Sequence, residues 1–119
     1  MQIETRLGDE IGRYLDLATE EIKLTAANMA NIDTPGYRTM GMDFEAEMRG
    51  AIAGLDGGRV GDPVKIHEVD GLIARPDGNN VSMDREGLRL AEAQLKFKTG
   101  VALLREQNQM VMDAIHADK

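Results

Sequence analysis

Two long stretches of helical periodicity, one near each end of the chain, constrain the fold most. In residues 3–31, apolar side chains recur every three or four positions, which places them on one face of an α-helix. A helix of this length cannot bury its apolar stripe alone, so it needs a partner helix. The members of the stripe that we expect to pack are Ile11, Ala18, Ile22 and Met29.

The second stretch, residues 83–116, repeats its apolar side chains every seven positions and can be capped by Ser82 or Asp84. A seven-residue repeat keeps one seam facing a neighbouring helix, so the pattern predicts helix–helix packing. Gly100 inside this helix costs about 1 kcal/mol relative to alanine, which indicates a close contact with another helix. The expected packing seam consists of Leu90, Phe97, Val101, Leu104, Val111 and Ile115.

The stretch from Asn28 to Arg38 lies where the first helical pattern stops and a polar segment begins. Pro35 removes a backbone donor and disfavours helical geometry at Thr34, while Gly36 permits a turn with positive φ. The chain therefore leaves the helix in a defined direction, and Tyr37 can pin this corner against the helix. We take six residues as candidate site residues: Asn28, Asn31, Thr34, Pro35, Gly36 and Tyr37.

The middle of the chain, residues 32–82, has no long periodic pattern and is rich in glycine. We expect an extended or irregular segment here, since glycine weakens both helices and strands. Within it, Asp43 can cap a short helix over Phe44–Ala53. Val64–Val69 alternates as a strand does, and the Asp-Gly pair after it can turn the chain back into a small β-hairpin with Leu72–Ala74.

Composition favours an all-α fold with a single domain over residues 1–119. Aromatic residues make up only 3% of the chain and Trp is missing, whereas eight Met join Ala, Leu, Ile and Val as the apolar side chains. This mixture suits helix packing better than a sheet core, which favours β-branched and aromatic residues. We therefore predict that the two long helices pack as an α-hairpin or coiled coil, with the irregular segment outside it.

The net charge of −7 argues against two classes of partner. Nucleic acids and anionic membrane surfaces both attract a basic face, so we expect neither to bind. No window approaches the ~20 apolar residues of a transmembrane helix, which argues against membrane insertion. Residues 1–15 lack the basic start and apolar block of a cleavable signal, so a location outside the cytoplasm would need another export route.

No pattern of catalytic or metal-ligating residues stands out in the sequence. The chain has no cysteine, and neither His67 nor His116 has a ligand at metal-binding spacing. Phosphate-binding loops and serine elbows are missing as well. We therefore expect no enzymatic activity, no metal and no cofactor.

Four segments carry a resemblance to a known family. Asn28–Arg38 reads Asn-Met-Ala-Asn-Ile-Asp-Thr-Pro-Gly-Tyr-Arg and resembles the N-terminal motif of bacterial flagellar rod and hook proteins. Met42–Met48 and Arg75–Glu86 are similar to segments of the proximal rod subunits in this family, as is the helix carrying Leu90-Ala91 and Leu95-Lys96-Phe97.

The resemblance implies a structural subunit that is exported by the flagellar type III apparatus without a cleaved signal. Such subunits assemble as a helical tube in the basal body, across the periplasm, and transmit torque from the motor. The implied partners are other copies of the chain, FlgC and other rod proteins, and FliE with the MS ring and export gate at the base. An alternative from another class is a soluble helical adaptor or type III export chaperone that binds a partner helix.

Overall fold

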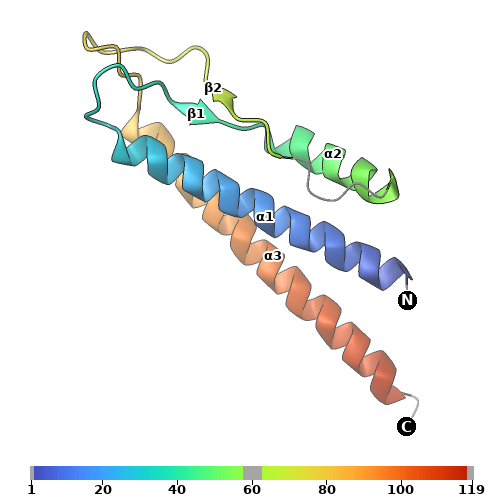
Figure 1. Ribbon diagram of the computed structural model, residues 1–119. Coiled ribbons are helices and arrows are strands. Elements are labelled where there is room, and N and C mark those ends of the chain that lie inside the picture. Colours follow the sequence, from blue (N-terminus) through green and yellow to red (C-terminus); the bar gives the residue numbers. More distant parts are fainter. Residues whose placement is uncertain (1, 58–62, 118–119) are drawn as a thin grey trace.

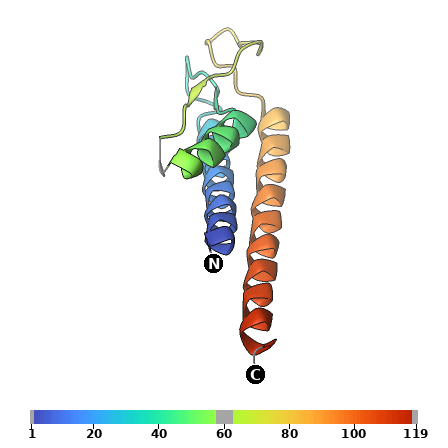
Figure 2. The ribbon, with the colours of Figure 1, turned by 90° about the vertical axis from the view of Figure 1, so that its right-hand side faces the viewer.

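The computed structural model describes residues 2–57 and 63–117, and its longest elements are two helices near the ends of the chain. Helix α1 spans Gln2–Ala30 and helix α3 spans Met83–Ala117. They run antiparallel and lie side by side, and the C-terminal end of α3 extends past the start of α1 (Figures 1 and 2). The predicted all-α fold, with long terminal helices packed together, is confirmed.

In the contact between α1 and α3, small and polar buried residues of α3 meet buried apolar residues of α1, namely Ile11, Leu17 and Ala18. A Cβ atom on Gly100 would lie 2.6 Å from Cδ2 of Leu15, so the missing side chain allows the two helices to approach closely. This confirms the close contact predicted at Gly100. The buried residues of α3 follow one another at intervals of seven: Glu86, Ala93, Gly100 and Gln107.

A third helix, α2 at Phe44–Gly57, lies inside the segment for which the sequence predicts extended or irregular structure. The Ala46 amide donates to the Asp43 carboxylate over 3.1 Å, so Asp43 caps this helix. The predicted short helix is therefore present and continues past Ala53. Figure 2 shows α2 crossing in front of α1.

Phe44 at the start of α2 joins the three helices. Its ring meets Tyr14 of α1 edge-on, with 5.3 Å between centroids, and Nζ of Lys96 on α3 lies 4.0 Å from the Phe44 centroid. Lys96 also forms a 3.2 Å ion pair with Glu21. Burial, and secondarily the charge of Glu21, raise the pKa of Tyr14. Phe44 thus connects α2 with both long helices.

The predicted β-hairpin is wrong. Strand β2 at His67–Glu68 pairs antiparallel with strand β1 at Met40–Gly41, far away in the sequence, instead of with the residues that follow Asp70–Gly71. The Val69 amide donates to the Thr39 carbonyl over 2.9 Å and continues this pairing. The physical reason is that Asn28, near the end of α1, bonds both backbone groups of Met40 and so holds β1 in place for β2 to pair with. The part of the irregular segment at 58–62 lies outside the described residues.

The helices of the described ranges do not include one that is long and apolar enough to cross a membrane. The whole molecule is elongated, with dimensions of 69 × 27 × 17 Å. Its sheet and its turns lie at the end where α1 finishes and α3 begins (Figure 1).

Candidate functional site at the polar corner

Two polar segments that are distant in the sequence meet where α1 ends and α3 begins. Residues 28–39 lead out of α1 and residues 75–86 lead into α3, and we call the two together the polar corner (Figure 1). The Gly36 amide donates to the Asp77 carbonyl over 2.9 Å, which joins the two segments directly through their backbones. The corner therefore contains the predicted site residues and a second set of partners.

Asn28 is the central side chain of the polar corner and is only 1% exposed. Its Nδ2 donates to the Met40 carbonyl over 2.8 Å and to Oε2 of Glu86 over 3.1 Å. Its Oδ1 accepts from the Tyr37 hydroxyl over 3.0 Å and from the Met40 amide over 3.1 Å. A side-chain amide has two donors and two acceptor lone pairs, so Asn28 uses its full capacity. One residue thereby links α1, β1, the turn and α3.

Asn79 and Asn80 hold the turn from the other side. The buried Asn79 donates from Nδ2 to the carbonyls of Asn31 and Thr34, over 2.9 and 2.8 Å. The Oδ1 atom of Asn80 accepts from the Thr39 amide over 2.6 Å. Both carbonyls lie in the turn just past α1 and also accept from the amides of Thr34 and Tyr37, so Asn79 is a second donor to each and caps the turn from a distant part of the chain.

Glu86 is a buried carboxylate at the start of α3. Nη1 of Arg85 lies 2.7 Å from its Oε1, and the Asn28 amide donates to its Oε2, so the charge is compensated on both oxygens. Burial, and secondarily the charge of Glu86, raise the pKa of Tyr37. The tyrosine therefore keeps its proton and remains a donor to Asn28.

Two glycines allow the segments to approach closely. Gly36 and Gly78 have φ angles of +74° and +87°, a region that other residues rarely adopt. A Cβ atom on Gly78 would lie 3.4 Å from the Cα of Gly36, so the two turns pack backbone against backbone. Arg75 closes the corner by donating to the Ile32 carbonyl.

The six predicted site residues between Asn28 and Tyr37 divide into a group inside the hydrogen-bond network and a group on the exposed side of the turn. Asn28 is buried, and Asn31 and Tyr37 are half-buried within the hydrogen-bond network. The exposed outer side of the turn holds Thr34, Pro35 and Gly36.

Reasoning from the sequence missed the partners in the second segment. They could have been found from the Asp-Gly-Asn-Asn run, because it combines a turn signal with two side chains that bind backbone groups. These missed residues are Asn79, Asn80 and Glu86.

The predicted packing seam is also divided between covered and open positions. On α1, Ile11 and Ala18 are buried, whereas Ile22 and Met29 are half-buried. On α3 the predicted seam lies beside the row of buried residues that includes Gly100. Its half-buried members are Leu90, Val101, Leu104 and Val111. Phe97 and Ile115 are 39% and 54% exposed. The role of this seam in packing stays a prediction.

The polar corner fixes a direction of the chain and offers no arrangement for catalysis. Its donors and acceptors are bonded to one another, as the contacts of Asn28 and Asn79 show. Across the described residues, no cluster of His, Asp or Glu side chains could hold a metal ion. The geometry is that of a stiff joint between two helices.

Comparison with known proteins gives a consistent result. No family model matches the chain. The chain is 32% identical to the flagellar basal body rod protein FlgB of Salmonella typhimurium, over 85% of this chain and 86% of that protein. It is 30% identical to FlgB of Proteus mirabilis, over 82% and 85% of the two chains. FlgB of Cereibacter sphaeroides is 29% identical, over 96% of this chain and 99% of the relative.

Proposed function

The chain belongs to the FlgB family of flagellar basal body rod proteins, and from this premise we propose that it is a structural subunit of the proximal rod. In this role, copies of the chain assemble helically and transmit torque from the motor across the periplasm. The subunit catalyses no reaction. The similarity to rod proteins over most of the chain supports this role.

The observation that carries the proposal is the polar corner. A shaft that transmits torque needs subunits whose parts do not rotate against one another. Asn28 and Asn79 supply such a stiff connection, because each bonds groups from different elements within a buried site. The turn and α3 are thereby fixed relative to α1.

Exposed apolar side chains support assembly into a larger structure. On the side of α3 away from α1, Leu88 and Leu95 are 61% and 66% exposed. Apolar surface of this kind often marks an interaction site. An interface that joins different faces of two copies without closing gives a helical filament. We infer that the exposed seam residues Phe97 and Ile115 pack against neighbouring subunits.

The other partners follow from the family. We propose contacts with FlgC and other rod proteins, and with FliE, the MS ring and the export gate at the base. The chain would reach this location in the periplasmic space through the flagellar type III export apparatus, without a cleaved signal.

Deletion of the gene in its own bacterium tests the proposed function. We expect cells that neither swim nor build rods, and an epitope-tagged copy that restores both and co-purifies with basal bodies. Complete rods in the deletion strain would contradict the proposal. A tagged chain found only in the cytoplasm, bound to another flagellar protein, would favour the adaptor or chaperone alternative.

A further inference from the structure

The loop between β2 and the polar corner presents an exposed apolar tip, Asp70–Ala74. Ile73 in this tip is 92% exposed. Gly71, with a φ of +81°, makes the turn that leads into it. Single exposed apolar residues are common on protein surfaces. The exposure of Ile73 therefore indicates a contact only if another surface of the protein can receive its side chain.

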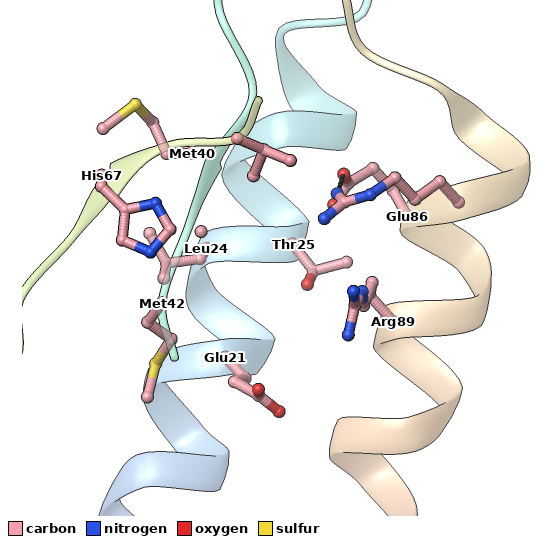
Figure 3. A pocket seen from close by; sticks show the side chains of 11 residues that line it. Glu21, Leu24, Thr25, Met40, Met42, His67, Glu86 and Arg89 are labelled. Carbon is pink, nitrogen blue, oxygen red and sulfur yellow. Dashed lines mark hydrogen bonds and ion pairs between the residues drawn. The ribbon is translucent and has the colours of Figure 1, made fainter. Parts of the chain in front are cut away.

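Such a surface is a pocket of about 220 Å³ between the two-stranded sheet and the start of α3. Methionine side chains adapt to the shape of what they enclose. A cavity of ~150 Å³ can hold a benzene molecule, so this pocket has room for the side chain of an isoleucine. Figure 3 shows side chains from α1, the sheet and α3 around it, among them Leu24, Thr25, Met40, Met42, His67 and Arg89.

The pocket carries charges of both signs, but Glu21 is paired with Lys96 and Glu86 with Arg85, which leaves Arg89 as the exposed charge that an acidic partner can meet. Within the described ranges, no hydrogen bond or ion pair joins the Asp70 carboxylate to another residue. Arg89 at the pocket has a side chain that is 55% exposed, and its 3.6 Å pair with Glu92 is an exposed pair on the same helix, which contributes little. Copies with a net charge of −7 repel each other in general, so contact is favoured where a carboxylate meets a guanidinium.

We propose that the tip of one copy inserts Ile73 into this pocket of a second copy, with Asp70 beside Arg89. The inference rests on the proposed function, because it requires copies to assemble. In this arrangement the tip of each copy enters the pocket of the next one, so the contact is head-to-tail and repeats along a filament. The tip leads directly into the polar corner, so the corner sets the angle at which it meets the next copy.

Disulfide cross-linking tests the contact. The chain has no cysteine of its own, so only the introduced thiols can form a disulfide. Ile73→Cys and Met42→Cys variants are prepared separately, mixed under conditions in which the purified chain polymerises, and oxidised. We expect mass spectrometry to find a peptide that links positions 73 and 42, which must join two copies. The matched control mixes Ile73→Cys with Asp9→Cys, an exposed position on α1 outside the pocket.

Charge reversal tests the ion pair. We expect Asp70→Arg and Arg89→Asp each to raise the critical concentration for assembly about five-fold, which corresponds to an exposed pair of about 1 kcal/mol. The double variant should return it to near the parental value. A critical concentration in the double variant that is as high as in the single variants would overturn the pairing of these two residues.

The outcomes separate this contact from the proposed function. Filaments that form without a 73–42 link overturn the contact and leave the rod subunit role in place. Failure to form either filaments or the link contradicts self-assembly and the contact together. A link that forms as readily with Asp9→Cys reports random collision and overturns the contact.

Discussion

Asn28, Asn79 and Asn80 hold the polar corner because an amide side chain can donate and accept hydrogen bonds at once. None of the three is more than 3% exposed. An aspartate in these places could not donate and would bring a charge into a buried site. An alanine would leave backbone groups without partners. The identity of these residues is therefore restricted by the bonds they make rather than by their size.

Replacing Asn79 by alanine should destabilise the protein by about 2–3 kcal/mol, because the buried amide of Val81 loses its acceptor and the carbonyls of Asn31 and Thr34 each lose one of two donors. Urea unfolding followed by circular dichroism measures this change in the free energy of unfolding. The matched control is Asn108→Ala, at an exposed position of α3, for which we expect a change within about 0.5 kcal/mol. Similar losses in the two variants would contradict the capping role of Asn79.

The sequence predicts one half of the corner and misses the other half for a physical reason. Pro35 and Gly36 act on their own backbone, so a local pattern reveals the turn. Asn79 acts on carbonyls 45 and 48 residues away, and Glu86 bonds to Asn28 across 58 residues. Contacts over such separations leave no periodic signal, and only the fold shows them.

Helix α3 meets α1 through a row of small and polar residues, and the apolar repeat of α3 lies on the flank of this row. Gly100 allows the backbones to approach, so the closest row is the one that carries Gly100 and Ala93. A pattern that counts apolar side chains finds the helix and its period, and the seam that it predicts lies beside this row. The caps Asp43 and Ser82 act locally, and they therefore mark the starts of α2 and α3 in the sequence as in the structure.

Two glycines of α3 should respond oppositely to alanine. Gly87→Ala should stabilise the protein by up to about 1 kcal/mol, because a Cβ there meets nothing within 4 Å and alanine favours the helix. Gly100→Ala should destabilise it by about 1 kcal/mol, because the new Cβ collides with Leu15 and crowds Tyr14. Thermal unfolding of the two variants measures the difference. Equal stabilisation by both changes would show that the helices do not need this close approach.

The attachment of α2 depends on Phe44. We expect Phe44→Ala to release α2 from the long helices, since the contacts with Tyr14 and Lys96 are lost. Hydrogen–deuterium exchange should become at least about ten-fold faster in α2 and change little in α1. The reason is that one helix can open locally with a free energy of its own while the rest of the protein stays folded. Ile52→Ala, at an exposed position of the same helix, serves as the control. An equal rise of the exchange rate in all three helices would contradict the local release of α2.

The whole molecule is long and thin, at 69 × 27 × 17 Å. Such a shape encloses little core of its own, and α3 leaves apolar residues such as Leu95 and Met110 in contact with solvent. The sequence predicts the helical hairpin that dominates this shape, because its two patterns are long and regular. It does not predict that residues 40–41 and 67–68 pair, because that pairing depends on the corner. We expect neighbouring subunits to supply much of the stability in the rod.

The most direct test of the account compares export with rod assembly in a strain whose only copy carries Asn28→Ala. We expect the variant to be exported at parental levels, while rods in purified basal bodies fall by about ten-fold or more, the change expected from a loss of ~1.4 kcal/mol in the assembling state. A strain with Asn108→Ala, the exposed control, should retain both parental export and parental numbers of rods. Normal rods with Asn28→Ala, or a loss of export as large as the loss of rods, would contradict the claim that the polar corner holds the subunit in the shape the rod requires.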